Sequence, residues 1–271
     1  MALNKEIWVN DIQEMLLPDN SFLTKGIDYS AFADAHTIHI PVEDGLVNVE
    51  VDRDTLPGTV TTTTEQCNEI DMHHFTTDPV RIYRPEDVEL SYDKRRLVTE
   101  KIAKSLNNKI ADDVLILLAN HRNFGEIEPT PSVKKALLLI ANFFDQNNYP
   151  EQDRYVLMSA DAYAELLNEL SEVQNSAFLA CADMKAGVVG QIYGLNILKR
   201  SVIVRDSPIE ILAWHKSQYS FAIGPVEVYS QENAPEYYGT ILSASVRFGG
   251  HANHTYCFKF GESNNPNPYN P

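Results

Sequence analysis

The feature that most constrains the fold of this chain is a long run of helical periodicity near its middle. Apolar residues recur every three or four positions, at Val98, Ile102, Leu106, Ile110, Val114, Leu117 and Leu118. This spacing predicts one helix from about residue 91 to residue 119, on the order of 40 Å long at 1.5 Å per residue. Gly125, Pro129 and Pro131 follow the pattern and should end the helix.

The composition is that of a folded globular protein, with 44% hydrophobic and 22% charged residues in 271 positions. That length fits one large domain or two interleaved small ones. The longest apolar run, at 136–144, is far shorter than the ~18 residues that span a bilayer. Acidic residues interrupt the first 17 positions, which argues against a signal peptide and for a cytosolic location. We expect reduced, mostly buried thiols at the three widely spaced cysteines, Cys67, Cys181 and Cys257.

Charge is unevenly distributed along the chain. The net charge of −16 argues against free nucleic acid or an anionic membrane as a direct partner. Residues 1–90 hold 18 acidic and 5 basic residues. The first half of the predicted helix is basic, with Lys94, Arg95, Arg96, Lys101, Lys104 and Lys109. An acidic first third that is poor in core-like runs is typical of a segment that lies against another surface, which is a first indication of an assembly protein.

Two amphipathic segments in this acidic third have too little apolar surface for a core of their own. Residues 3–17 have helical spacing and form either an arm or a terminal helix packed on its own domain. Residues 36–42 and 46–53 alternate in hydrophobicity around Glu43-Asp44-Gly45, which predicts a β-hairpin. Such a hairpin either packs on the body of the protein or reaches to a neighbour.

The rest of the chain predicts a mixed α/β body. A helix is expected at 132–146 with Ser132 as its N-cap, and a second helix after the strand at 154–158, with Ser159 as its N-cap. Strands are expected at 79–84, as a pair within 187–204, around 213–224, and in the closing segments VEVYS, TILSASVRFG and TYCFKFG. The last ten residues are unpatterned and should be exposed.

No motif makes a positive case for catalysis or for a cofactor. The segment GVVGQIYG lacks the Lys-Ser/Thr of a phosphate-binding loop, and G-x-S-x-G, H-E-x-x-H and C-x-x-C are absent. His251, His254 and Cys257 are close enough to bind a metal, but an extended backbone points the two histidines to opposite faces, and no fourth ligand is evident. His73 and His74 diverge for the same reason. We therefore expect no catalytic, cofactor or metal site.

Four stretches in the same order resemble the major capsid protein of tailed bacteriophages. Residues 70–119 resemble its peripheral strand and long spine helix, and 147–170 its axial strand and helix with a polar-Pro turn and Tyr-x-x-Leu-Leu. Residues 190–204 and 213–230 resemble the following glycine-punctuated unit and the closing section. The resemblance implies an α+β, Hong Kong 97-type capsid fold with an N-terminal arm, an extended β-hairpin loop, a peripheral domain with a long spine helix, and an axial domain.

The resemblance also implies a domain organisation. The N-terminal arm falls on 1–34, the extended hairpin loop on 35–65, and the peripheral domain with the spine helix on 66–131. The axial domain falls on 132–225, the return strands of the peripheral domain on 226–250, and the closing axial strand and tail on 251–271.

In this family the arm and the hairpin loop lie across neighbouring subunits, which implies a homo-oligomeric shell of pentamers and hexamers. We expect the acidic arm and hairpin to meet the basic face of the spine helix of a neighbour. The interface residues expected on this basis are Trp8, Asp44, Gly45, Glu50, Asp52, Lys94, Arg95, Arg96 and Lys101.

The implied partners are portal, scaffolding and possible decoration proteins, and double-stranded DNA enclosed without sequence-specific contact in a virion capsid that assembles in the host bacterial cytoplasm. No membrane and no cofactor are implied. Residues 35–65 contain no lysine, so the Lys–Asn crosslink of some family members is not expected. No scaffolding segment precedes the arm, which implies a separate scaffolding protein or an omitted leading peptide.

Two alternatives stay open. An encapsulin-like nanocompartment shell has the same fold and encloses an enzyme instead of a genome. An acidic cytosolic metal-dependent hydrolase using His251, His254 and Cys257 belongs to a different class.

Overall fold

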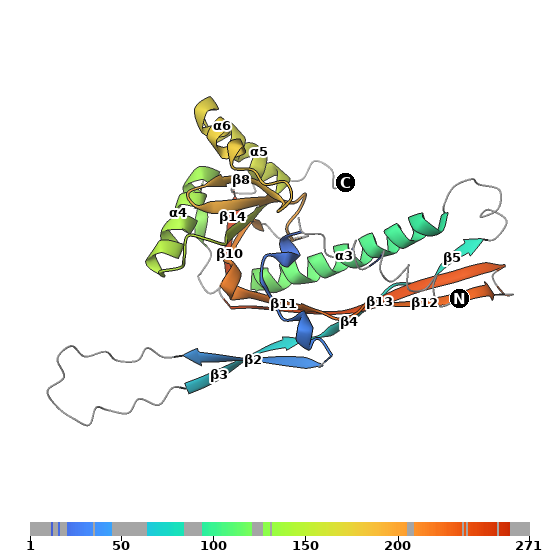
Figure 1. Ribbon diagram of the computed structural model, residues 1–271. Helices are drawn as coiled ribbons and strands as arrows, with labels where there is room; N and C mark the ends of the chain where they lie inside the picture. Colours follow the sequence, from blue (N-terminus) through green and yellow to red (C-terminus); the bar gives the residue numbers. More distant parts are fainter. Residues whose placement is uncertain are drawn as a thin grey trace, which may run out of the picture.

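The computed structural model describes residues 21–34, 36–44, 64–83, 94–120, 127–130, 132–204, 209–234, 238–253 and 255–260, together with Ile12, Leu16 and Glu236. The molecule is elongated (Figure 1). A body of helices and strands lies at one side, a long helix with long strands extends from it, and a two-stranded hairpin reaches the opposite way.

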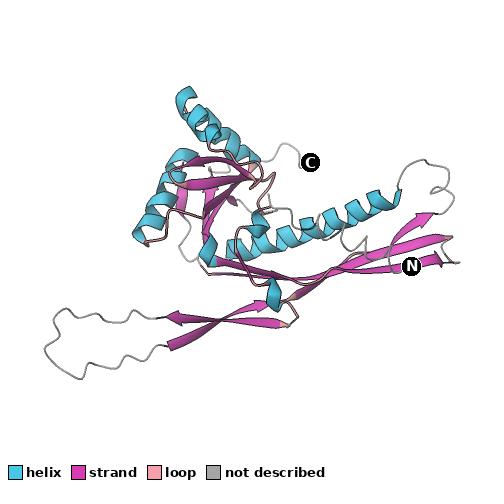
Figure 2. Ribbon diagram, in the orientation of Figure 1, coloured by secondary structure: helices cyan, strands magenta, loops and turns pink. Residues whose placement is uncertain are grey.

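The body is built on a six-stranded mixed sheet in the order β6-β14-β10-β7-β9-β8. Its strands are β6 (Ile127–Thr130), β14 (Thr255–Phe260), β10 (Ile209–His215), β7 (Arg154–Met158), β9 (Leu195–Lys199) and β8 (Val188–Ile192). Three helices accompany it: α4 (Val133–Gln146), α5 (Ala160–Glu169) and α6 (Glu172–Ala180). Figure 2 shows these helices gathered in the body.

The helices of the body begin at capping residues that their sequences specify. The Ser132 hydroxyl accepts a hydrogen bond from the Lys135 backbone N–H, and Ser159 does the same for Ala162, as predicted. Glu169, at the end of α5, accepts from the backbone N–H groups of Val133 and Lys134 at 3.0 and 2.8 Å. Its carboxylate thus satisfies orphan donors of α4 and ties the two helices together.

A second six-stranded sheet carries the long extension. Its order is β1-β11-β13-β12, with β4 and β5 also paired to β13. The strands are β1 (Ile27–Asp28), β11 (Tyr219–Ile223), β13 (Gly239–Ala252), β12 (Glu227–Ala234), β4 (His73–Thr76) and β5 (Val80–Tyr83). Single 3-10 turns lie at Phe22–Thr24, Ser30–Phe32 and Lys216–Gln218.

The predicted long helix is confirmed as α3 (Lys94–Asn120), which lies along this sheet. Its stripe is buried at Ile102, Leu106, Ile110, Val114 and Leu118. These side chains share one core with apolar residues of β10–β13, among them Trp214, Phe221, Val228, Leu242, Val246 and Phe248. The helical period of 3.6 residues places these apolar side chains on one face of α3, and the sheet covers that face.

The structure describes two residues of the predicted N-terminal amphipathic segment, Ile12 and Leu16. Both are helical, fully buried and members of the α3 core, and the Asn107 side-chain amide donates to the Leu16 carbonyl. At these two positions the chain packs on its own core. The remainder of 3–17, including Trp8, lies outside the described residues.

The predicted pairing of 36–42 with 46–53 is wrong, because the first strand pairs with a different segment. β2 (Thr37–Asp44) pairs antiparallel with β3 (Thr64–Asp71), in register from Thr37 opposite Asp71 to Asp44 opposite Thr64. Asp44 is therefore strand and not part of a tight turn. Alternation correctly predicted a strand at 36–42, but it cannot identify the partner strand, which depends on contacts made at the base of the hairpin. Residues 46–53 lie outside the described part.

The strands expected at 79–84, 154–158, within 187–204, around 213–224 and in the three closing segments are confirmed. The patterns do not predict β4 or α6. None of the helices described is both long and apolar enough to cross a bilayer. The expectation of mostly buried cysteines is wrong for two of the three, because Cys67 lies on exposed β3 and Cys181 just after the poorly covered α6.

Candidate subunit interfaces

The β2–β3 hairpin is the segment least supported by its own subunit. It forms a separate two-stranded sheet, so each of its strands lacks a neighbour on one side within the part of the chain described. Among its described side chains away from the base, His39, Pro41, Cys67 and Glu69 are exposed, and His39 Nδ1 and Glu69 Oε1 form a surface pair at 3.3 Å. An isolated two-stranded hairpin is marginally stable in water, and its unpaired edges are templates for another chain.

The base of the hairpin is held firmly. Ile38, Ile70 and Met72 are buried with Ala33 and Ala222 in a small separate cluster. A Cβ on Gly249 of β13 would lie 2.6 Å from the Asp71 carbonyl oxygen and 2.7 Å from Ile70 Cγ2. Gly249 therefore allows the hairpin to cross β13 in close contact, and this crossing sets the direction in which the hairpin projects.

The sequence-predicted interface residues divide between the two ends of the molecule. Lys94, Arg95 and Arg96 open α3, and Lys101 is exposed one to two turns later. Asp44 ends β2, and Figure 1 shows the β2–β3 hairpin reaching away from this half of α3. One subunit therefore does not bring them together. Trp8, Gly45, Glu50 and Asp52 lie outside the described residues.

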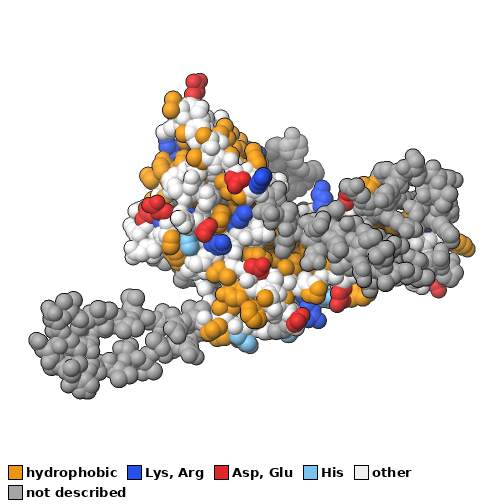
Figure 3. Space-filling view, in the orientation of Figure 1, with side chains coloured by type: hydrophobic (Ala, Val, Ile, Leu, Met, Phe, Trp, Pro, Cys, Tyr) orange, Lys and Arg blue, Asp and Glu red, His pale blue; other side chains and the backbone are white. Residues whose placement is uncertain are grey.

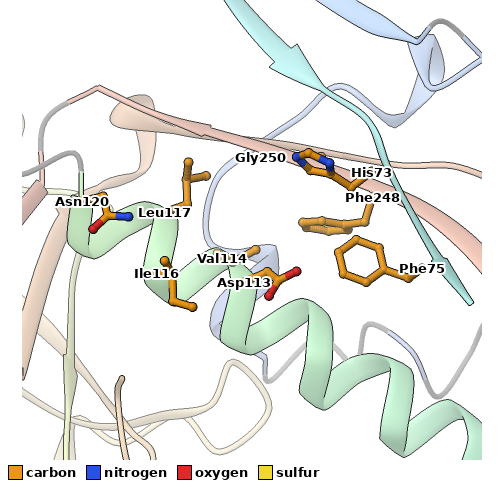
Figure 4. A pocket seen from close by; sticks show the side chains of 10 residues that line it. His73, Phe75, Asp113, Val114, Ile116, Leu117, Asn120, Phe248 and Gly250 are labelled. Atoms are coloured by element: carbon orange, nitrogen blue, oxygen red, sulfur yellow. The ribbon is translucent and has the colours of Figure 1, made fainter. Parts of the chain in front are cut away.

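Lys101 lines a pocket of about 360 Å³ between α3 and the strands β4 and β5. A second pocket, of about 270 Å³, adjoins it at Phe75 and continues along the helix. Figure 4 shows the Phe75 and Phe248 rings facing α3 near Val114. Lys109 lines one pocket and Asp113 the other, and their side chains form an ion pair at 3.0 Å. The exposed side of α3 thus has an apolar groove with charged walls.

The opposite face of this sheet is polar. Because Ala244, Val246 and Phe248 belong to the α3 core, strand alternation turns Ser245 and Arg247 away from the helix. Both line a pocket of about 370 Å³, and His74 stands opposite Arg247 on β4. The Ser245 hydroxyl is buried without a hydrogen-bond partner among the described atoms. This face therefore offers polar contacts.

The tip of the body exposes apolar side chains. In α6 only Phe178 is buried, against Gly190 of β8. Val173 and Met184 are 81% and 75% exposed, and Leu179 is also exposed. Orange hydrophobic side chains lie on the visible face around α4 and α6 (Figure 3). Like the hairpin, α6 contributes little to the core of its own subunit.

Among the groups with shifted pKa values, Lys109 lies in the groove, where its hydrogen bond with Asp113 raises its pKa, whereas Glu210 and His215 lie apart from these surfaces. Burial raises the pKa of the Glu210 carboxyl, and the nearby Asp161 and Glu165 carboxylates raise it further. Burial lowers the pKa of His215, whose Nδ1 accepts from the Ser217 backbone N–H and whose Nε2 donates to the Gln152 carbonyl. Both arrangements lie within the body. The Ser217 hydroxyl also lies 2.7 Å from His215 Nδ1, and the other ring nitrogen faces a backbone carbonyl, that of Gln152.

The metal-ligand candidates are not assembled in the part of the chain that is described. His251 Nε2 lies 2.8 Å from Asn253 Oδ1, an ordinary polar contact. His254 and the Cys257 side chain are not described, and the described residues contain no group of three potential ligands. His73 and His74 are exposed neighbours on β4, where strand geometry separates them.

No family model matches the sequence, and no curated protein matches it. Solved structures match its fold. The chain is similar to the capsid structure of cyanophage P-SCSP1u, with a TM-score of 0.68 and 14% identity over 90% of this chain and 88% of that chain.

Two further matches are similar in extent. The capsid of Ralstonia phage GP4 has a TM-score of 0.68 and 13% identity over 94% of this chain and 92% of that one. The capsid of a native GTA particle computed with C5 symmetry has a TM-score of 0.66 and 12% identity over 91% and 92%. At these identities the likeness concerns the fold, and it confirms the expected α+β fold of phage capsid proteins.

Proposed function

We propose that this chain is a major capsid protein, which assembles as pentamers and hexamers into the icosahedral head that encloses the double-stranded DNA of a tailed phage. The observation that carries the proposal is the β2–β3 hairpin, which is anchored at its base and has no third strand within the described subunit. A fold shared with three phage or phage-like capsids over nine-tenths of the chain supports it.

The domains follow from this proposal. The arm is 1–34, the axial domain 132–225, and the peripheral domain consists of the spine-helix region 66–131 and the return strands 226–250. The extended loop is 35–65, and β3, which returns from it, ends at Asp71 within the peripheral domain. The closing strand and tail occupy 251–271, and β14 joins the sheet of the axial body.

The acidic hairpin and arm of one subunit meet the basic start of α3 in another. Within one subunit the β2–β3 hairpin and the start of α3 project in different directions (Figure 1), so a pairing of hairpin and helix joins two copies. The residues involved are Trp8, Asp44, Gly45, Glu50 and Asp52 on one side, and Lys94, Arg95, Arg96 and Lys101 on the other. Repetition around a closed symmetric shell multiplies a weak pairwise attraction.

The role is structural and non-enzymatic, and the protein works in the virion capsid after assembly in the host cytoplasm. Its partners are further copies of itself, a portal, a scaffolding protein and possible decoration proteins. A net charge of −16 fits a container that encloses DNA without binding it tightly.

The test is light scattering on the purified full chain after size-exclusion chromatography, with negative-stain imaging of the same fractions. The chain is also co-expressed with a candidate scaffolding gene from its genomic neighbourhood. Closed shells, or rings of five or six, are the expected result. A compact monomer under every one of these conditions contradicts the proposal.

An encapsulin-like nanocompartment is the second candidate, because the same fold serves it. The two differ in contents, so nuclease-resistant DNA inside shells from infected cells supports the phage head, whereas a co-purifying enzyme supports the compartment. A hydrolase based on His251, His254 and Cys257 would instead show stoichiometric metal in a small oligomer and lose activity on His254→Ala.

A further inference from the structure

Four residues other than glycine have positive backbone φ angles, in the part of the chain that is described. Two of them, Asn148 (φ 56°) and Asp153 (φ 60°), are of the types that tolerate this conformation best. The other two are tyrosines, Tyr193 (φ 51°) and Tyr238 (φ 49°). A positive φ strains the backbone of a residue with a bulky side chain. The positive φ of the two tyrosines therefore requires an explanation, whereas that of Asn148 and Asp153 does not.

Tyr193 occupies the tip of the β8–β9 hairpin. Ile192 pairs with Leu195, which leaves Tyr193 and Gly194 as a two-residue turn, and Gly194 also has a positive φ of 73°. A turn with positive φ at both positions favours Asn-Gly. Asparagine would be the residue favoured by the backbone conformation at this position, but the sequence has tyrosine. The Tyr193 side chain is 41% exposed.

Tyr238 is the last residue of the four-residue connection between β12 and β13, because Ala234 pairs with Gly239. It directly precedes Gly239, where β13 begins after β12 ends at Ala234. Its side chain is 74% exposed, and Figure 1 shows this end of β12 and β13 at the extremity of the molecule away from α4 to α6.

The two exposed rings make no specific polar or aromatic contact within the described part of the subunit. Among the described residues, no hydrogen bond, cation–π contact or ring pair involves Tyr193 or Tyr238, whereas Tyr219 is fully buried and stacks on Phe221. Among these described residues, no hydrogen bond or ring contact of either tyrosine offsets the strain at its position. Strained residues of this kind persist where a function outside local folding retains them.

We propose that Tyr193 and Tyr238 are anchor residues whose rings become buried against other copies of this chain. The inference rests on the proposed function, because a shell supplies another copy at every edge of each subunit. A tyrosine ring offers a large contact area with few rotatable bonds, and tyrosine is enriched at the cores of interfaces. At a hairpin tip, the positive φ holds the ring outward from a rigid two-stranded support.

The experiment compares Tyr238→Asn, Tyr238→Phe, Tyr193→Asn and Tyr193→Phe in the full chain. Asparagine relieves the backbone strain and removes the ring, so the unassembled subunit should unfold at a urea concentration equal to or above that of the unsubstituted chain. Shell yield with the scaffolding protein should fall at least tenfold. Phenylalanine keeps both ring and strain, so its shells should form at near the original yield.

The matched control is Tyr229→Asn. Tyr229 lies on β12 of the same hairpin and is 52% exposed, with no positive φ. Its substitution should leave shell yield within twofold. A loss as large as that of Tyr238→Asn would show that any exposed tyrosine on this hairpin matters equally, and would overturn the special role of the tip.

The remaining outcomes are equally decisive. If an asparagine variant assembles as well as the unsubstituted chain, that tyrosine is not an anchor. If it lowers the urea midpoint, the ring supports the fold instead, and the inference is overturned for that residue. If the unsubstituted chain forms no shells, the proposed function fails and this inference fails with it. If the unsubstituted chain forms shells and the asparagine variants form them at the same yield, only this inference is overturned.

Discussion

Gly249 and Ile70 lie in such close contact that a Cβ on Gly249 would come within 2.7 Å of Ile70 Cγ2. The same Cβ would be 2.6 Å from the backbone carbonyl oxygen of Asp71, which cannot rotate out of the way. This crossing joins the hairpin to β13. It is possible because residue 249 is a glycine, which has a hydrogen atom where alanine would have a methyl group.

Gly249→Ala should therefore displace the base of the hairpin. We expect the free energy of unfolding to fall by about 1–3 kcal/mol, the usual effect of overpacking. Hydrogen exchange of the β2 and β3 amides should accelerate more than that of α3. The comparison variant is Gly250→Ala. Its Cβ would come closest to the movable Leu117 side chain, at 3.2 Å, and would lie at ordinary contact distance, 3.7 Å, from the Ser220 carbonyl oxygen and the Tyr219 ring. Equal destabilisation by the two variants would contradict the close contact as the cause.

Arg154 should be essential for the turn that precedes β7. Its side chain is 3% exposed, and its guanidinium reaches Asp145 Oδ1, the Pro150 carbonyl and the Tyr149 carbonyl at 2.6–2.8 Å. Lysine cannot serve these three directions at once, so Arg154→Lys should reduce the free energy of unfolding by about 2–3 kcal/mol in urea denaturation.

Asp145→Asn provides the control for that variant. The Asp145 side chain is 62% exposed, so the loss of its charge should change stability by less than about 1 kcal/mol. If the two substitutions have the same effect, the ion pair and not the buried carbonyl contacts stabilises the turn.

His215 should make stability depend on pH. Burial lowers its pKa from 6.5, so the unfolded chain binds a proton more readily than the folded one. The contribution of His215 is complete above pH 6.5 and is lost as the pH falls from there through the lowered pKa. Protonation also removes the Nδ1 acceptor for the Ser217 N–H.

His215→Asn tests this relationship by urea denaturation between pH 7.5 and pH 5. The variant should be less stable at pH 7.5, and the difference from the unsubstituted chain should shrink as the pH falls. A difference that stays constant over this range would show that His215 acts only through packing.

Reversing the charge at the start of α3 should impair assembly. The triple variant Lys94→Glu, Arg95→Glu and Arg96→Glu is expected to lower shell yield, and the added change Asp44→Lys, Glu50→Lys and Asp52→Lys should restore part of it. High salt should weaken assembly of the unsubstituted chain because it screens exposed charges.

A control with the same change of charge uses exposed lysines elsewhere, at Lys135, Lys185 and Lys216. Their reversal should leave shell yield close to normal. Unchanged assembly of the Lys94–Arg96 variant, as measured by light scattering, would rule against the proposed pairing of acidic hairpin and basic helix.

The sequence by itself determined the elements that depend on neighbours along the chain. The stripe of α3 follows from apolar residues spaced every three or four positions, and Ser132 and Ser159 cap helices because their hydroxyls reach backbone N–H groups three residues on. The turn at Gly194 joins two strands that alternate on either side of it. The resemblance of four stretches, in the same order, to phage major capsid proteins implied the α+β capsid fold.

Only the tertiary structure decided which segments meet. Alternation in 36–42 predicts a strand but not its partner, so the pairing of β2 with β3, and the place of Asp44 within it, came from contacts at Ile38, Ile70 and Gly249. Exposure of Cys67 and Cys181, and the strained tips at Tyr193 and Tyr238, are likewise invisible to local pattern. Burial and backbone angles at such positions are set by packing between distant parts of the chain, and residue types alone do not encode that packing position by position.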